Sequence, residues 1–386
     1  MNDLGKNRPM KPDALIFTTL IGAMLASCAS RPPYDDDRYQ EDLAPSTVRM
    51  ISEAISPILA SQQEEGNWCW QDTVTVPQNV GATAIVCSAL LHAAPLDDKN
   101  IESAISRGID FILKHLTTTF TTFRGIDGNY SSEQRIWGYA YALILFCQID
   151  GARRVHNRKE EVKPWVQKIV DCIARDRNYL IHDGWAYSGS GGPSSFNTAS
   201  VTLALLYAKE QGARVDGDCL KHAAKTLLTL RNENGAYWYN RVQIHIDNPS
   251  TVPGSAARSA ICELALYLLD KSSQERLERA VDLFHENWET LNQHRKREGT
   301  HAGEHGIAPY YFFFGLYYTA LATEFIETSK RQALRDNLLK IITKTRDPEG
   351  TWNDLPEECA RGYATAMVIL ALLGPNIPRP PELSKA

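Results

Sequence analysis

The feature that most constrains how this chain can fold is an internal repeat, which occurs six times across roughly residues 50–375. Each segment combines a turn that contains glycine, a nearly uncharged stretch that opens with a pair ending in alanine (the repeat pair), and an amphipathic stretch. Successive repeat pairs are 56, 59, 61, 60 and 46 residues apart. The turn glycines are Gly66, Gly128, Gly184, Gly235, Gly306 and Gly350, and the repeat pairs are Thr83-Ala84, Tyr139-Ala140, Thr198-Ala199, Ser259-Ala260, Thr319-Ala320 and Thr365-Ala366.

The two helices predicted for each repeat differ in polarity. Residues 198–208 and 363–373 carry no charge, which predicts helices buried on most sides, whereas 101–116 and 220–230 alternate charged and apolar residues with helical spacing. Six such hairpins close into an all-α structure, an α6/α6 toroid, with inner helices around a central cavity and the six turns at one end. Residues 307–323 are uncharged as well, and their phase in the repeat and Pro309 predict an inner helix rather than a membrane span.

Composition agrees with one large domain. The chain has 386 residues, of which 43% are hydrophobic, and its net charge is -5. A mildly acidic balance argues against a protein that binds nucleic acid through electrostatics, and a mean hydropathy of -0.32 excludes a polytopic membrane protein. We therefore expect a monomer without a nucleic-acid partner.

The N-terminal residues predict export. Lys6, Arg8 and Lys11 precede an apolar run at 14–26, which is too short to span a bilayer and is typical of a signal peptide. The run ends in Leu-Ala-Ser-Cys, which resembles the lipobox of bacterial lipoproteins and makes Cys28 the lipidation site. An ordinary cleaved signal peptide and a stray apolar run are the alternatives.

These features divide the chain into four parts: a lipoprotein signal peptide (1–27), a flexible tether (28–45), the toroid (46–378) and a C-terminal tail (379–386). The expected location is the bacterial cell envelope, with a lipid anchor as the sole contact with the membrane. Because Ala29, and not Asp, follows the cysteine, the periplasmic side of the outer membrane is favoured.

Two stretches of the repeat resemble a known family. Asp183-Gly184-Trp185-Ala186-Tyr187, with Gly191-Gly192-Pro193 and Asn197-Thr198-Ala199, is similar to the repeat of protein prenyltransferase β-subunits and squalene-hopene cyclases. Glu349-Gly350-Thr351-Trp352 with Gly362-Tyr363-Ala364-Thr365-Ala366 is similar too. The likeness extends over roughly residues 50–375, and the bacterial prenyltransferase/squalene oxidase repeat proteins are the most similar group. It implies the toroid fold, and it says much less about activity.

The residues that carry this family's reactions are missing. The cyclases protonate an alkene with the central Asp of an Asp-x-Asp-Asp-Thr-Ala motif, and here Phe196 and Asn197 stand at the acid's position. The protein prenyltransferases hold zinc with an Asp-x-Cys pair and a distant His, and Ala364 occupies the position of that His. The sequence therefore disfavours both reactions and predicts no metal and no cofactor.

Aromatic residues gather in or beside the turns, at the predicted mouth of the barrel. They could line a cavity for an isoprenoid, stack on sugars, or fill the gaps between neighbouring hairpins. Tyr239 adjoins the fourth turn as well. The predicted ligand-cavity residues are Trp68, Trp70, Trp185, Tyr187, Tyr237, Trp238, Tyr310, Tyr311 and Trp352.

Four residues are candidates for acid–base chemistry. His301, Glu304 and His305 match the His-x-x-Glu-His pattern of one group of metallopeptidases, but glycines surround them and favour a polar loop. Asp354 is the fourth candidate. Two carboxylates that face each other across the mouth could instead act as in toroidal glycoside hydrolases or lyases. The other carboxylates near this end are Asp72, Asp127, Asp183 and Asp247.

Cys69 and Cys359 lie in the first and last turns, which become neighbours when the ring closes, and an oxidising compartment would let them form a disulfide.

The leading functional hypothesis is that a hydrophobic small molecule or lipid, such as an isoprenoid, binds in the central cavity. The alternatives are a carbohydrate-active hydrolase or lyase and a non-catalytic scaffold of the envelope.

Overall fold

The structure is a computed structural model. It describes residues 43–70, 76–93, 97–116, 135–177, 184–187, 192–240, 251–299, 301 and 303–383. The predicted signal peptide, Cys28 and most of the tether lie outside the described residues. Among the helices of the described part, none is both long enough and apolar enough to cross a membrane.

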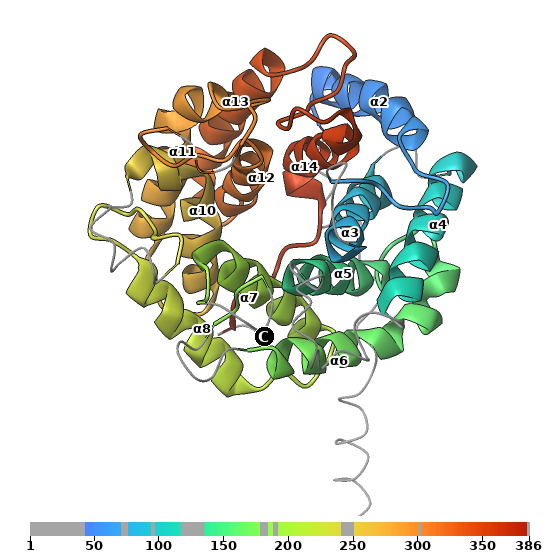
Figure 1. Ribbon diagram of the computed structural model, residues 1–386, viewed down its shortest axis with the longest axis horizontal. Coiled ribbons are helices and arrows are strands. Elements are labelled where there is room, and N and C mark those ends of the chain that lie inside the picture. Colours follow the sequence, from blue (N-terminus) through green and yellow to red (C-terminus); the bar gives the residue numbers. More distant parts are fainter. Residues whose placement is uncertain are drawn as a thin grey trace, which may run out of the picture. The chain divides into compact units, whose positions relative to one another are not determined.

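The described residues form two concentric rings of helices, an inner and an outer one, so the predicted α6/α6 toroid is confirmed (Figure 1). The inner ring consists, in spatial order, of α3 (Val76–His92), α5 (Arg135–Ile149), α7 (Ser195–Glu210), α10 (Val252–Leu268), α12 (Tyr311–Thr323) and α14 (Arg361–Leu373), which returns to α3. The outer ring consists of α2 (Pro45–Ala60), α4 (Lys99–His115), α6 (Lys159–Arg175), α8 (Gly217–Leu230), α11 (Gln274–Asn292) and α13 (Thr328–Lys344).

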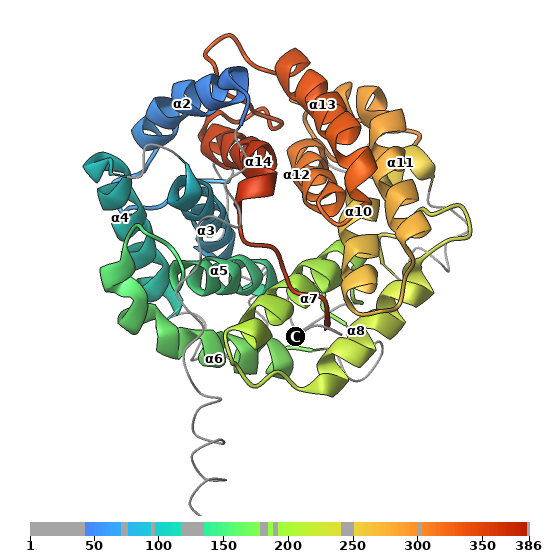
Figure 2. The ribbon, with the colours of Figure 1, turned by 180° about the vertical axis from the view of Figure 1, so that it is seen from behind.

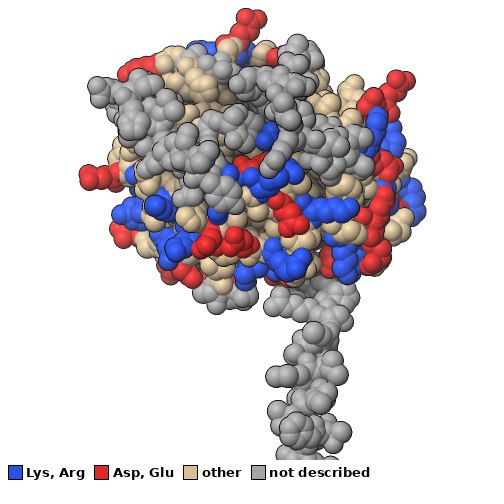
Figure 3. Space-filling view, turned by 60° about the horizontal axis from the view of Figure 1, so that its bottom comes forward, with Lys and Arg blue, Asp and Glu red and all other residues tan. Residues whose placement is uncertain are grey.

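The difference in polarity between the two predicted helix types matches their burial. Every residue of α12 is buried, because neighbours surround an inner helix on all sides. Helix α4 buries only one stripe, which includes Ile101, Ile105 and Ile112. Its N-terminus is capped by Asp98, whose carboxylate accepts the backbone N–H groups of Asn100 and Ile101. On the face shown in Figure 3, basic and acidic side chains are interspersed.

Helix α12 begins at Tyr311, four residues after the predicted start at 307. Pro309 disfavours the helical conformation in Ala308, so the chain enters the helix through a turn. In that turn the N–H of Tyr311 donates to the carbonyl of Ala308, and the N–H of Phe312 donates to that of Pro309.

In three repeats the same two hydrogen bonds of a tryptophan connect the turn to an outer and an inner helix. The Trp68 indole N–H donates to the carbonyl of Ile58 in an outer helix (2.9 Å), and the Trp68 backbone N–H donates to the Thr83 hydroxyl (3.0 Å) in the next inner helix. The threonine is the first member of the repeat pair, and in these three repeats its hydroxyl makes the same bond to the turn. The same two bonds join Trp185 to Ile173 and Thr198, and Trp352 to Ile342 and Thr365.

The sixth hairpin is assembled from distant parts of the chain. No outer helix follows α14 among the described residues, and α2, which precedes the first turn, packs on α14 in its place. The two segments meet closely, because a Cβ at Gly362 would lie 2.9 Å from Cδ1 of Trp68. The ring is thus closed by the first and last α-helices that the structure describes.

After α14 the chain turns back across the inner ring, at the end opposite to the turns (Figure 2). Ile377 and Pro378 are buried, and the Tyr207 hydroxyl of α7 donates to the carbonyl of Pro378 (2.7 Å). Glu324, at the end of α12, accepts bonds from the guanidinium groups of Arg335 (2.6 Å) and Arg379 (2.9 Å). These contacts attach the segment as far as residue 379 to the ring.

Candidate functional site

Aromatic side chains converge at the turn end of the ring, around the axis. They enclose a cavity of about 20 Å³, enough for about one water molecule. Its walls come from two turns and from the N-terminal ends of four inner helices. The residues that line this aromatic cavity are Trp70, Trp137, Tyr187, Phe196, Tyr310, Tyr311, Phe314 and Tyr363.

The rings contact one another at an angle. Trp70 lies 5.4 Å from Tyr310 and 5.9 Å from Trp137, measured between ring centroids, and Trp137 lies 6.0 Å from Tyr363. On the other side, the Phe196 ring is edge-on to Tyr311 and to Phe314. Tilted and edge-on pairs suit the quadrupoles of the rings.

Helical register explains which residue of α5, α7 and α14 reaches the cavity. Trp137, Phe196 and Tyr363 each stand two residues before the first member of a repeat pair. Helix α12 holds Tyr317 at this position and contributes Tyr311 and Phe314 instead. In α3 and α10 the same position holds Gly81 and Ala257, and these small residues make room for neighbours. A Cβ at position 81 would lie 2.1 Å from Cε3 of Trp137. The large rings fit because two of the six positions are small.

A group of tyrosines forms the rim of the cavity. The hydroxyls of Tyr187 and Tyr239 are hydrogen-bonded (2.6 Å), and the rings of Tyr310 and Tyr311 lie 4.7 Å apart. Burial raises the pKa of all four hydroxyls, so they remain neutral near pH 7. The ring of His301 packs against Tyr239 at 4.9 Å, and burial lowers the pKa of its imidazole.

A buried cation lies beside this rim. The Arg258 guanidinium donates to the backbone carbonyls of Tyr237 (2.7 Å) and Gly254 (2.6 Å), and it lies 6.0 Å from the centre of the Tyr239 ring. Burial lowers its pKa, yet a guanidinium remains charged in proteins. These bonds hold the positive charge in place against the fourth turn.

Asp354 lies behind the wall of the aromatic cavity. Its Oδ2 accepts the backbone N–H of Phe313 (3.2 Å) in the first turn of α12, next to Phe314 of the wall. Burial raises the pKa of Asp354 to about 7, although the Phe313 N–H and the nearby Arg295 charge act in the opposite direction. It is therefore a carboxyl group that exchanges its proton near neutral pH.

The other predicted acid–base residues lie in a loop. Gly303, Gly306 and His301 have φ angles of +74°, +59° and +55°, which an α-helix does not contain. Glu304 is exposed and His305 is half-buried. Among the described residues, no group of three His, Cys, Asp or Glu side chains could hold a metal ion. The segment is therefore the polar loop that its glycines indicate.

Of the nine aromatic residues predicted for the cavity, four line it and five do not. Trp70, Tyr187, Tyr310 and Tyr311 line it. Trp238 is half-buried against the core outside it. The remaining four are fully buried in the turns, where they fill the gaps between hairpins: Trp68, Trp185, Tyr237 and Trp352.

Sequence reasoning missed four residues of the wall, which are Trp137, Phe196, Phe314 and Tyr363. Three of them share the register position described above, so aligning the repeats at their repeat pairs would have pointed to them, and also to Tyr317, which does not line the cavity. Of the carboxylates considered for a hydrolase, Asp72, Asp127, Asp183 and Asp247 lie outside the described residues. Cys69 and Cys359 are half-buried, and neither forms a disulfide in the structure.

No protein-family model matches the sequence, and no curated protein matches it either. Solved structures do share the fold. The type II terpene cyclase MstE from Scytonema has 13% sequence identity and a TM-score of 0.51, and the match covers 85% of this chain and 97% of that one. A variant of that enzyme was solved in complex with its substrate, geranylgeranyl dihydroxybenzoate.

An inactive variant of an alpha-1,6-mannanase from Salegentibacter, in complex with alpha-1,6-mannotetrose, has 11% identity and a TM-score of 0.54 over 85% of this chain and 98% of that one. A protein from Actinoplanes is similar at 13% identity and a TM-score of 0.52, over 85% and 99% of the two chains. At such low identity these matches show the fold alone. This chain is thus an α/α toroid similar to both terpene cyclases and toroidal glycosidases.

Proposed function

We propose that this protein binds a hydrophobic ligand, of isoprenoid or lipid type, in the aromatic cavity at the turn end of the ring. The observation that supports it best is the convergence of eight aromatic residues on one point of the axis. Such walls bury apolar chains, and their ring faces stabilise cations. A terpene cyclase of the same fold acts on a geranylgeranyl compound, which agrees with this ligand class.

The ligand enters by displacing rings, because the present cavity holds only about one water molecule. Tyr187 and Tyr310 are half-buried, whereas the deeper rings of Phe196 and Tyr363 are buried. We therefore propose that the two tyrosines turn outward and that the ligand's chain takes their place between Trp70 and Phe196.

Any proton transfer at this cavity would use Asp354, which has a pKa of about 7 and lies behind the wall. The acid motif of the cyclases and the zinc ligands of the prenyltransferases are absent, so the proposal is a binding function with no assigned reaction. We also propose that the aromatic cavity derives from the repeat family that the sequence resembles.

A carbohydrate-active enzyme is the second candidate, because an alpha-1,6-mannanase has the same fold. A glycosidase needs two carboxyl groups on either side of the bond that it cleaves. No carboxyl group of the described residues lines the aromatic cavity; Asp354 bonds to Phe313 beside the wall, and Glu263 is engaged by Arg231 (3.0 Å) and Tyr237 (2.5 Å). We therefore place the hydrophobic ligand first.

Native mass spectrometry of the full chain with geranylgeraniol tests this function. We expect a 1:1 complex, and we expect Trp137→Ala to weaken it at least tenfold because the central ring is lost. Trp238→Ala is the matched control, since Trp238 lies outside the cavity. Absence of a complex, or equal losses in both variants, would overturn the proposal. Release of reducing ends from alpha-1,6-mannan would favour the enzyme instead.

We also propose that the protein is an envelope lipoprotein anchored through Cys28. Expression of the full chain in a Gram-negative bacterium with a radiolabelled fatty acid tests this location. The expected result is a labelled protein in the outer-membrane fraction and an unlabelled, unprocessed Cys28→Ser variant. Equal labelling and fractionation of the two proteins would contradict the lipid anchor.

A further inference from the structure

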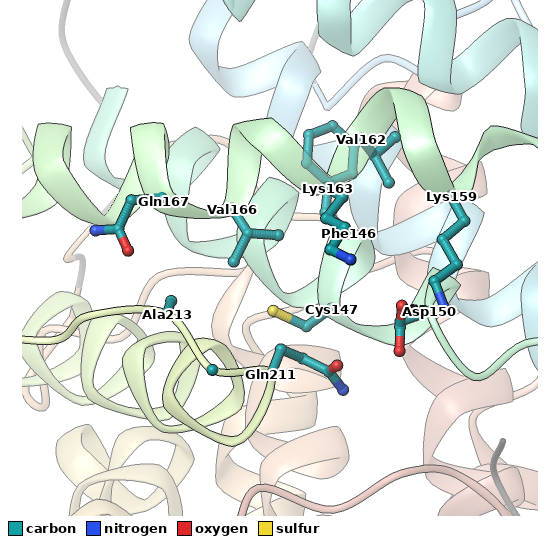
Figure 4. A pocket seen from close by; sticks show the side chains of 11 residues that line it. Phe146, Cys147, Asp150, Lys159, Val162, Lys163, Val166, Gln167, Gln211 and Ala213 are labelled. Carbon is teal, nitrogen blue, oxygen red and sulfur yellow. Dashed lines mark ion pairs between the residues drawn. The ribbon is translucent and has the colours of Figure 1, made fainter. Parts of the chain in front are cut away.

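A second cavity lies at the end of the ring opposite to the turns, between the second and third hairpins (Figure 4). Its volume is about 200 Å³. It lies where α5 ends, beside the first half of α6, and it is bordered by the residues that follow α7. It is ten times larger than the aromatic cavity and is separate from it.

The inner wall of this cavity is apolar. Phe146 and Cys147 of α5 and Val162 and Val166 of α6 are buried, and they form its floor together with Ala213. Figure 4 shows the sulfur of Cys147 pointing into the space between Val166 and Gln211. Burial raises the pKa of the Cys147 thiol, so the floor is uncharged at neutral pH.

The repeat explains why there is space here. Cys147 stands eight residues after the first member of its repeat pair, and the same position in three other inner helices holds Leu91, Leu206 and Leu373. A cysteine is smaller than the leucine of these three hairpins, and the remaining two have Tyr267 and Glu327. The opposite wall is open at Gly212, where a Cβ would meet no atom within 4 Å.

The rim carries one cation without a partner. Lys159 is paired with Asp150 (2.8 Å), whereas no carboxylate of the described residues pairs with Lys163. The Gln167 amide is occupied, since it donates to Asp171 (2.8 Å) and accepts the Arg214 backbone N–H (2.8 Å). The Lys163 ammonium is thus available for an anion.

The backbone at the rim does not compete for that anion's position. The carbonyl groups of Tyr207, Ala208 and Lys209 at the end of α7 already accept N–H groups from residues 211–213. The polar side chains that remain at the rim are the Lys163 ammonium and the Gln211 amide, and both can donate. An apolar floor beneath one unpaired ammonium suits a ligand with one anionic end and a short apolar body.

We propose that this second cavity binds a small carboxylate with an aliphatic chain, whose head lies at Lys163 and whose chain lies over Cys147 between α5 and α6. The volume is below the ~300–1,000 Å³ of sites for drug-sized ligands, so the chain is short. This site is independent of the function proposed for the aromatic cavity.

Isothermal titration calorimetry of the full chain with sodium octanoate tests the site. We expect saturable 1:1 binding, and octan-1-ol should bind at least tenfold more weakly because it lacks the charge. Lys163→Gln should weaken octanoate binding about tenfold or more. Lys168→Gln, on the same helix with its ammonium over the Trp165 ring, is the matched control and should change nothing.

Cys147→Leu places the repeat's own residue in the cavity and should abolish binding while the protein stays folded. Val166→Phe fills the same space from α6 and serves if the first variant does not fold. Absence of saturable binding, equal effects of the two lysine variants, or binding that survives a folded filling variant would each overturn the proposal. Loss of octanoate binding in Trp137→Ala, with Cys147→Leu unaffected, would place the ligand in the aromatic cavity and overturn it too.

Discussion

Gly81 of α3 lies so close to the indole of Trp137 in α5 that a Cβ at position 81 would be 2.1 Å from Cε3 of the ring. The absence of one side chain thus allows the Trp137 indole, one of two in the aromatic cavity, to reach the axis. Real Cβ atoms do not approach a carbon atom so closely, and both helices are packed on all sides, so neither can easily move away.

Gly81→Ala is therefore expected to destabilise the fold by about 1–3 kcal/mol through overpacking, although alanine is the better helix former. In a Trp137→Ala background the same change should be neutral or stabilising by up to ~1 kcal/mol. Urea denaturation of the four proteins gives the coupling between the two positions. Additive effects would mean that the two residues do not interact as the structure describes.

Asp354 predicts a pH dependence of stability. Its folded pKa of about 7 is above the value of 3.8 for an unburied carboxyl. The carboxyl group therefore contributes its full stability below about pH 4, and this contribution is lost as the pH rises to about 7. A difference of roughly 3 pKa units corresponds to at most ~4 kcal/mol.

Asp354→Asn keeps the acceptor for the Phe313 N–H and has no proton to lose. Its stability relative to the original protein should therefore increase between pH 4.5 and pH 7.5, as measured by urea denaturation at each pH. Asp336→Asn, at an exposed position of α13, is the control and should show no such trend. A flat difference for Asp354→Asn would show that this carboxyl is ionised in the folded protein throughout the range.

We expect Glu324 to attach the segment after α14 to the ring. Its buried carboxylate accepts bonds from Arg335 and Arg379, so Glu324→Ala leaves two guanidinium groups without their anion. The expected cost is about 3–5 kcal/mol, accompanied by faster proteolysis after residue 374. Glu327→Ala, three residues away and exposed, should cost less than ~0.5 kcal/mol. Equal protease resistance in the two variants would contradict an attachment through Glu324.

The disulfide predicted between Cys69 and Cys359 remains a prediction. Both thiols are half-buried and lie in segments that the ring brings together, since Gly362 packs on Trp68. In protein recovered from an oxidising compartment, intact-mass measurement should show a gain of about 2 Da on reduction, and Cys359→Ser should remove that gain. An unchanged mass would leave the two residues as free thiols.

The arrangement of helices was predictable because burial follows charge. Residues 198–208 carry no charge and became an inner helix, and residues 220–230, with charges on one side, became an outer one. The cavity was less predictable. The sequence predicts that the aromatic residues of the turns line the cavity, yet Trp68, Trp185 and Trp352 bond to outer helices. In α5, α7 and α14, helical register decides which ring reaches the axis.

The proton affinity of Asp354 and the space beside Cys147 could not be predicted from one segment. Asp354 is buried because α12 and the final turn meet, which depends on packing between repeats. The second cavity arises where α5, α6 and the chain after α7 come together, and its size depends on the difference between a cysteine and a leucine. Both features become visible only when distant residues are placed in contact.

The neighbouring positions of α2 and α14 determine the order of events during synthesis. About 300 residues separate the end of one helix from the start of the other. At ~5–20 residues per second, roughly 15–60 s pass between their emergence from the ribosome. Until α14 emerges the ring is open and the buried face of α2 lacks its partner, so the last α-helix that the structure describes completes the packing of the first.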